Sequence, residues 1–264
     1  MKKLIVLLLV ILLAFALCAC DGGTSTTEAY IPAKIDADGT AFIPMMDGTV
    51  VSIKGDVEDA EITADRDVIV VLESDGWLYV TSPTDTTEKT TIATNAVGFN
   101  YLRSDGVIYR DEESEFFRYT FADAANVSLG TDVAINVAEN TLSALIADNQ
   151  GDIYILAHDS SERERIGTYD ESCWPVKIAD DCKMAVWAEK DENVETMHLY
   201  VNGEHHKLEE VDSPYYATYA DFNNQQTFVA VVNSYSNNIY FTTIDGTEVV
   251  HAKLGSELGS IIVY

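Results

Sequence analysis

The chain has 264 residues, with 16 Lys and Arg against 44 Asp and Glu, which gives a formal net charge of −28 at pH 7. Binding to nucleic acid or to an anionic membrane surface requires clustered basic side chains, so this composition excludes both as partners. A cationic partner or bound cations suit the charge better, and solubility with mutual repulsion between molecules explains it equally well.

The first predicted element is an export signal at residues 1–19. Lys2 and Lys3 precede an unbroken apolar run from Leu4 to Leu17. A membrane-spanning helix needs about 20 apolar residues, and this run is shorter. An uncleaved anchor that extends to Cys20 and a plain secretory signal are the alternatives.

The end of this run, LCAC from Leu17 to Cys20, resembles the lipobox of bacterial lipoproteins, with a small residue before the cysteine. The resemblance implies that Cys20 becomes the first residue of the mature chain and carries a diacylglycerol. Such acyl chains hold a soluble domain on a bilayer. The protein is therefore expected outside the cytoplasm, attached to the bacterial cell membrane, with residues 20–30 as the lipidated cysteine and a flexible tether rich in small polar residues.

From residue 31 to residue 264 we predict one all-β domain. Apolar residues alternate with polar ones or form runs of four to seven that are rich in Val, Ile, Tyr and Thr. Turn sequences such as DG and NG separate these runs, and no convincing helical period appears.

Two signatures recur in alternation along this region. The first is a tight-turn sequence followed by a strand, in six copies that begin at Asp47, Asp75, Asp105, Gln150, His198 and Asn237. The second is a strand end followed by a polar stop, in six copies: ITAD at Ile62, IATN at Ile92, LGTD at Leu129, IGTYD at Ile166, LEEVD at Leu208 and LGSE at Leu254. Each unit between stops has room for three or four short strands.

Six such units resemble a β-propeller, in which blades of three to four strands pack around a central channel. The first unit lacks an inner strand, and the lone strand Ile261 to Tyr264 is expected to complete it, so that the C-terminus closes the first blade. A β-sandwich, or two small β domains, is the alternative fold.

In a propeller, the turns of the first signature and the loops after the second are expected to project from one face. That face would gather carboxylates near the channel: Asp47, Asp75, Asp105, Asp132, Asp170 and Asp212. Such a ring can bind a cation, a cationic ligand or a basic partner. Asp is also favoured in turns because its side chain caps the backbone. No cofactor is predicted, with calcium as the alternative.

Trp174 and Tyr215 begin equivalent strands in neighbouring units, and two further tyrosines lie close to Tyr215 in SPYYATYADF. Exposed rings could form a platform for a sugar or a peptide. Packing between blades would explain the same residues.

Cys173 and Cys182 remain after cleavage of Cys18 and lipidation of Cys20. An even number of cysteines in an exported protein is consistent with a disulfide, although two buried free thiols would leave the same sequence pattern. No CxxC or histidine spacing accompanies them, so no metal site is predicted.

The five histidines accompany no signature of a nucleophile, and no catalytic residue is predicted. We predict an envelope lipoprotein whose acidic propeller binds a small-molecule ligand or a protein partner without catalysis. The alternatives are a propeller hydrolase or lyase with an acid-based site built from loops of different blades, and a scaffold subunit of an envelope complex.

Overall fold

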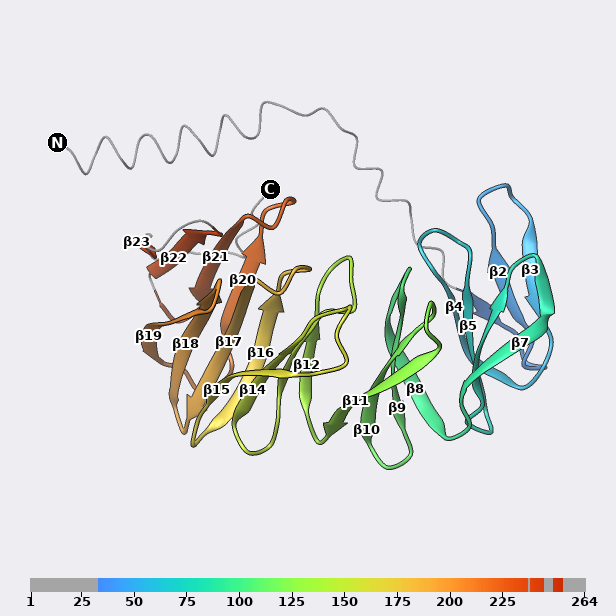
Figure 1. Ribbon diagram of the computed structural model, residues 1–264, viewed down its shortest axis with the longest axis horizontal. Coiled ribbons are helices and arrows are strands. Elements are labelled where there is room, and N and C mark those ends of the chain that lie inside the picture. Colours follow the sequence, from blue (N-terminus) through green and yellow to red (C-terminus); the bar gives the residue numbers. More distant parts are fainter. Residues whose placement is uncertain (1–32, 237, 245–248, 254–264) are drawn as a thin grey trace. The chain divides into compact units, whose positions relative to one another are not determined.

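The computed structural model describes residues 33–236, 238–244 and 249–253. These residues form six antiparallel sheets of three or four strands, numbered here 1 to 6 in chain order (Figure 1). The prediction of an all-β chain is confirmed. Within the described ranges, no helix has the length and apolarity to cross a membrane. The predicted signal, Cys20 and the tether lie outside the described residues.

The first three sheets cover residues 34–131. Sheet 1 contains β1 (Lys34–Ile35), β2 (Ala41–Pro44) and β3 (Val50–Ile53). Sheet 2 contains β4 (Val57–Ile62), β5 (Ile69–Glu73), β6 (Leu78–Ser82) and β7 (Asp85–Ala93). Sheet 3 contains β8 (Ala96–Arg103), β9 (Gly106–Asp111), β10 (Glu115–Thr120) and β11 (Ala125–Thr131).

The last three sheets follow in the same way. Sheet 4 contains β12 (Ala134–Val137), β13 (Ala144–Ala147), β14 (Asp152–Leu156) and β15 (Glu164–Thr168). Sheet 5 contains β16 (Ser172–Ile178), β17 (Met184–Asp191), β18 (Val194–Val201) and β19 (Glu204–Asp212). Sheet 6 contains β20 (Thr218–Phe222), β21 (Phe228–Asn233), β22 (Asn238–Thr243) and β23 (Val250–Lys253).

Every sheet is a meander, in which each strand pairs with the next one along the chain. The chain therefore enters the first strand and leaves the fourth strand of a four-stranded sheet at the same end, which also holds the turn between strands two and three. We call this the proximal end. The distal end holds the other two turns.

The second strands of sheets 2 to 5 are apolar on both faces because each lies between two neighbouring sheets. In β5, Ile69 and Val71 face sheet 1, whereas Val70 and Leu72 face sheet 3. Side chains alternate between the faces of a strand, so a strand that is covered on both sides needs a continuous apolar run. The runs ALIA in β13 and MAVWA in β17 have the same cause.

Five hydrophobic clusters join each sheet to the next one along the chain. Trp187 of sheet 5, for example, packs with Leu145 of sheet 4. Within the described residues, no cluster contains side chains from both sheet 1 and sheet 6. Successive meanders that pack face to face are the blades of a β-propeller, which confirms the predicted fold class over a sandwich of two sheets.

Sheet 1 supplies strands two to four of a blade. The amide of Val57, where the chain enters sheet 2, donates to the carbonyl of Gly39 in the β1–β2 turn. The amide of Ala96, where the chain enters sheet 3, donates in the same way to Gly76 in the β5–β6 turn, between strands two and three. No described strand occupies the first position of sheet 1. Its predicted occupant, Ile261 to Tyr264, lies outside the described residues.

The repeat units differ in register from those predicted. ITAD ends the first strand β4, whereas IATN, LGTD, IGTYD and LEEVD come at the ends of the fourth strands β7, β11, β15 and β19. The DGVIYR copy forms the second strand of sheet 3, whereas DGWLYV forms the third strand of sheet 2. Sheets 2 and 3 consequently hold four strands each, where the sequence units left room for fewer.

Candidate functional site

The six predicted aspartates do not share one end of the blades. Asp75, Asp132, Asp170 and Asp212 lie at the proximal ends of sheets 2 to 5. Asp47 in the β2–β3 turn and Asp105 in the β8–β9 turn lie at distal ends, because their hairpins join different strands of the blade. The expectation of a single six-membered ring was therefore wrong for these two residues.

At least two of these aspartates cap their own turns. An oxygen of Asp75 accepts a hydrogen bond of 3.0 Å from the amide of Trp77. Asp47 accepts from the amide and the hydroxyl of Thr49, at 2.9 and 2.6 Å, and these hydrogen bonds lower the pKa of Asp47. Turn capping thus explains both residues without a ligand.

A second set of turn carboxylates and amides was not assigned to the candidate site from the sequence. Side chains at the end of the second strand cap the proximal turn in four sheets: Asp36, Asp111, Asp148 and Asn233. Each begins a five-residue pattern with Gly or Ser at the fourth place, as in DADGT, DEESE and DNQGD. This pattern was the signal that could have fixed the register. DADG is thus a hairpin turn, in which Asp36 accepts from the amides of Asp38 and Thr40.

The proximal ends of sheets 5 and 6 carry exposed aromatic side chains. Their exposed fractions are 51% for Trp174 in β16, 71% for Tyr215, 60% for Tyr219 in β20 and 52% for Tyr235 in the β21–β22 turn. Tyr216 is half-buried, and its ring centroid lies 5.9 Å from that of Trp174. We call these five residues the aromatic end.

Buried polar groups hold the loop that carries Tyr215 and Tyr216. The fully buried carboxylate of Glu195 in β18 accepts hydrogen bonds from the amides of Ala217 and Thr218, at 2.8 and 2.9 Å, and from the Asn233 side chain at 3.0 Å. The ammonium group of Lys190 donates to the carbonyl of Ser213. A buried carboxylate is tolerated when donors satisfy its oxygens, and here they fix both ends of the loop.

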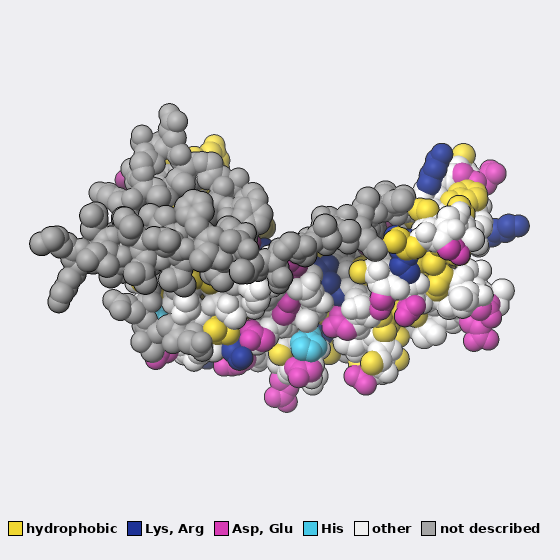
Figure 2. All heavy atoms as spheres, turned by 90° about the horizontal axis from the view of Figure 1, so that it is seen from above, with side chains coloured by type: hydrophobic (Ala, Val, Ile, Leu, Met, Phe, Trp, Pro, Cys, Tyr) yellow, Lys and Arg dark blue, Asp and Glu magenta, His cyan; other side chains and the backbone are white. Residues whose placement is uncertain are grey.

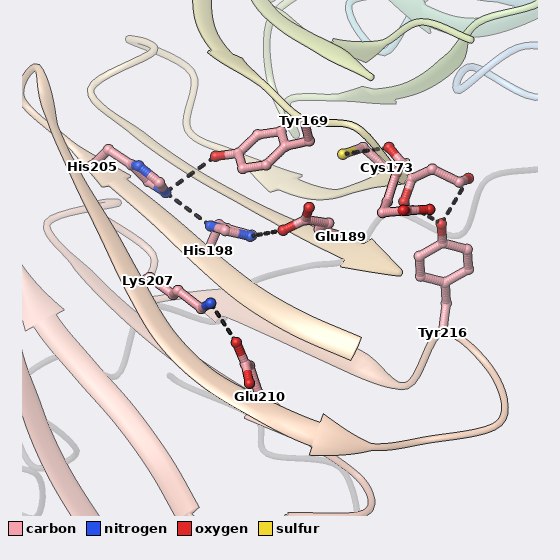
Figure 3. A network of polar contacts seen from close by, with 10 residues as sticks. Tyr169, Cys173, Glu189, His198, His205, Lys207, Glu210 and Tyr216 are labelled. Atoms are coloured by element: carbon pink, nitrogen blue, oxygen red, sulfur yellow. Dashed lines mark hydrogen bonds and ion pairs between the residues drawn. The ribbon is translucent and has the colours of Figure 1, made fainter. Parts of the chain in front are cut away.

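Tyr216 and the neighbouring turn complete this arrangement. The Tyr216 hydroxyl donates to the carbonyl of Ser172 at 2.8 Å, across from sheet 6 to the start of β16 (Figure 3). The amide of Ser234 donates to the carbonyl of Ala217, which brings the turn with Tyr235 beside the loop. These hydrogen bonds hold the backbone of the loop and of the turn that carry the exposed tyrosines.

Acidic side chains lie at the same end of sheet 5 as Trp174: Asp170 and Glu171 precede β16, and Asp191 ends β17. Burial raises the pKa of Glu189; Lys207 opposes this, whereas the carboxylates of Glu171, Asp170 and Asp191 raise it further. Each of the three carboxylates is close enough to Glu189 to disfavour its negative charge. On the face shown in Figure 2, by comparison, acidic side chains are scattered over the described surface.

A hydrogen-bonded chain runs from Glu189 into sheet 5 (Figure 3). Nε2 of His198 lies 3.2 Å from Glu189, and Nδ1 of His198 lies 2.9 Å from Nε2 of His205. Tyr169 lies 3.3 Å from the same nitrogen of His205, and the buried ring of Trp187 stacks on His198 at 5.3 Å.

Burial, followed by the charges of His205 and Lys207, lowers the pKa of His198 to about 3. His198 is therefore neutral near pH 7, and its contact with Glu189 is a hydrogen bond rather than an ion pair. These partners assign the single proton of His198 to Nε2 and make Nδ1 an acceptor for His205. The chain fixes two rings in the sheet, and sequence reasoning missed it because His198 and His205 lie on separate strands.

Cys173 and Cys182 are free thiols in the structure. Cys173 pairs with Glu189 near the proximal end of β16, whereas Cys182 lies in the distal β16–β17 turn. Five strand residues separate the two ends, or about 16 Å at the usual rise, which is too far for a disulfide. Burial raises the pKa of Cys173 to about 12, so this thiol is unreactive.

A cavity of about 420 Å³ lies between sheets 2 and 3 and includes Asp75 in its lining, with Glu58, Asn95 and Glu112. It is open and polar. Among the described residues, no group of three or more His, Cys, Asp or Glu is placed to hold a metal ion.

No family model and no curated protein matches the chain. Solved structures with similar folds include Hsv2 of Kluyveromyces lactis, at 8% identity and a TM-score of 0.47, covering 82% of this chain and 75% of that chain. Another is an oligogalacturonate lyase in complex with manganese, at 9% identity and 0.44, covering 84% and 73%. A third is the WD40 domain of Toxoplasma gondii coronin, at 11% identity and 0.44, covering 84% and 66%. Such weak likeness does not separate binding proteins from enzymes.

Trp174 and Tyr215 thus lie at the same end of two adjacent sheets, and Trp174 remains 51% exposed although it contacts Tyr216 of the neighbouring sheet. Asp170 and Asp212 precede β16 and follow β19 at that end. Asp75 and Asp132 belong to sheets 2 and 3 and are not part of this grouping.

Proposed function

We propose that this protein is an exported lipoprotein, anchored to the bacterial cell membrane through Cys20, whose propeller binds a partner at the aromatic end without catalysis. The observation that carries the binding role is the exposure of Trp174 and three tyrosines at one end of sheets 5 and 6. A contiguous exposed apolar surface is unfavourable for a monomer and marks interaction sites. Tyrosine and tryptophan also dominate binding hot spots.

Two features support binding over catalysis. Among the described residues, the carboxyl groups with a raised pKa are those of Asp59 and Glu189, which lie on sheets 2 and 5. A pair of acid catalysts would need to face one another across a pocket. The aromatic end, by contrast, gathers its side chains without any nucleophile or free base among them. A scaffold role in an envelope complex differs only in the partner.

The anchor is tested by replacing Cys20 with Ala in the full chain and separating membranes from soluble material. We expect Cys20→Ala to leave the membrane fraction, whereas the matched Cys18→Ala variant stays with it. Retention of Cys20→Ala in washed membranes would refute lipidation at Cys20.

The binding surface is tested by affinity capture from detergent-solubilised membranes. The double variant Trp174→Ala/Tyr215→Ala is compared with Met46→Ala/Val50→Ala, which removes exposed apolar side chains from sheet 1. We expect Trp174→Ala/Tyr215→Ala to fail to capture proteins that Met46→Ala/Val50→Ala still captures. Identical captured proteins for both variants would contradict a site at the aromatic end.

A further inference from the structure

We propose that the partner presents an extended segment with Lys or Arg side chains to the aromatic end. This inference rests on the proposed function and names the chemistry that the same surface would recognise. Two observations carry it: the exposed faces of the rings, and the acidic side chains beside them.

The rings offer flat, negatively polarised faces. Trp174 and Tyr216 are tilted by 33° with centroids 5.9 Å apart, and Tyr215 is exposed by 71%. An ammonium or guanidinium group is attracted to the face of such a ring, most strongly to Trp. The same protein already makes this contact elsewhere, since Nζ of Lys89 lies 4.6 Å from the Trp77 ring and 4.2 Å from the Tyr79 ring.

The acidic side chains supply the second half of the recognition. Asp170 and Glu171 directly precede β16, which carries Trp174, and Asp191 ends β17 in the adjoining turn. All three carboxylates are exposed, and their places at the start of β16 and the end of β17 put them at the same end of sheet 5 as Trp174. A cation that binds among them relieves their mutual repulsion.

The lysines of sheet 5 have partners other than Asp170 and Glu171, and Lys207 pairs with Glu210. Lys190 donates to the carbonyl of Ser213, and Lys177 pairs with Asp221 at 3.6 Å between β16 and β20. Among the described residues, no ion pair joins a Lys or Arg side chain to Asp170 or Glu171. The complementary charge is left to the partner, and several rings with several carboxylates suit a segment with more than one cation.

The inference is tested with a fluorescently labelled peptide of alternating Lys and Ser and the full-length protein in detergent micelles. Fluorescence anisotropy measures binding of this peptide and of its counterpart with Glu in place of Lys. We expect only the Lys peptide to bind. Trp174→Ala/Tyr215→Ala should weaken binding at least tenfold, and added salt should weaken it because exposed charges are screened.

A charge control separates this site from general attraction to an acidic chain. Asp170→Asn/Glu171→Gln removes two charges at the aromatic end, whereas Asp123→Asn/Glu139→Gln removes two exposed charges from sheet 3 and the β12–β13 turn. We expect the first pair to weaken binding at least fivefold more than the second. Equal effects of the two pairs, or equal binding of the Glu peptide, would overturn the inference.

The same measurements distinguish failure of this inference from failure of the proposed function. If neutral oligosaccharides bind at the aromatic end and the Lys peptide does not, the basic partner is wrong and the binding surface stands. If Trp174→Ala/Tyr215→Ala binds the Lys peptide as tightly as the unaltered protein and captures the same membrane proteins, both proposals fail.

Discussion

At the scale of single residues, His198 makes the fold sensitive to acid. Its pKa is about 3 in the folded protein against a usual value of 6.5, so below pH 6.5 the unfolded chain takes up a proton that the folded chain refuses. Stability is therefore complete above pH 6.5 and falls as the pH drops towards 3. At about 1.4 kcal/mol per pH unit, His198 should remove about 2 kcal/mol between pH 6.5 and pH 5.

The test is urea unfolding of the unaltered protein and of His198→Phe, a variant that keeps a ring against Trp187 and cannot titrate. The variant should lose this part of the pH slope. Burial raises the pKa of Glu189, so protonation of Glu189 stabilises the folded protein, whereas protonation of His198 destabilises it. Because carboxyl groups titrate at lower pH, the two proteins are compared above pH 5. Parallel pH profiles for the two proteins would contradict this role.

Glu195 is the residue on which the shape of the aromatic end depends. Replacing it with Gln puts an amide group where amides of Ala217 and Thr218 now donate to a buried oxygen. Leaving buried donors unsatisfied costs about 1–3 kcal/mol each, so Glu195→Gln should lower the free energy of unfolding by about 3 kcal/mol.

Hydrogen exchange gives the local readout for this change. The amides of Ala217 and Thr218 should exchange faster in Glu195→Gln and remain protected in Glu192→Gln, which changes an exposed residue of the β17–β18 turn. Unchanged protection in Glu195→Gln would mean that other contacts hold the loop.

At the scale of elements, Asp180 joins the distal turns of three consecutive sheets. Its carboxylate accepts from the amide and side chain of Asn140 in sheet 4 at 2.9 and 2.7 Å, and from Gln226 in sheet 6 at 2.6 Å. Hydrogen bonds to a charged group contribute about 1.5–3 kcal/mol, and partial exposure reduces this. Asp180→Ala should therefore lower the free energy of unfolding by about 2 kcal/mol.

The adjacent Asp181 is the matched control. It is exposed and contacts only Lys183 in the described structure, at 3.1 Å for both the amide and the ammonium group. Asp181→Ala should change the denaturation midpoint by less than half the shift caused by Asp180→Ala. Equal shifts would show that the link between sheets adds nothing.

The strands could be predicted better than their places in the blades. DG turns supply the positive φ that any tight hairpin needs, so they do not reveal which two strands are joined. Gly76 joins strands two and three of sheet 2, whereas the DG at Asp105 joins strands one and two of sheet 3. The better guide was the run that is apolar on both faces, IVVL in β5 and GVIY in β9, because the second strands of these sheets are covered on both sides.

Only those residues of the candidate site that follow the repeat pattern could be predicted from the sequence. Trp174 and Tyr215 were identified from their equivalent places in neighbouring units, whereas Tyr235 lies on another hairpin and reaches them only through the fold. Glu195 was not identifiable, since a buried carboxylate in VETMHLYV has the same sequence pattern as a solvent-exposed one. Its role depends on donors more than 20 positions away along the chain.

At the scale of the whole molecule, charge and fold suggest one functional design. A stack of meanders buries both faces of its second strands and leaves turns and sheet ends to contact ligands. The large net charge of −28 favours solubility, and exposed carboxylates lie at the end of sheet 5 that carries Trp174. Closure of sheet 1 by Ile261 to Tyr264 stays a prediction and does not enter this argument.

The most direct measurement is photo-crosslinking in intact cells from a light-activated amino acid placed at Tyr215, with the same probe at Glu139 as the distal control. We predict a discrete crosslinked partner from position 215 and none from position 139, with the adduct lost when Trp174→Ala is added. The same adduct from both positions, or its persistence with Trp174→Ala, would contradict binding at the aromatic end.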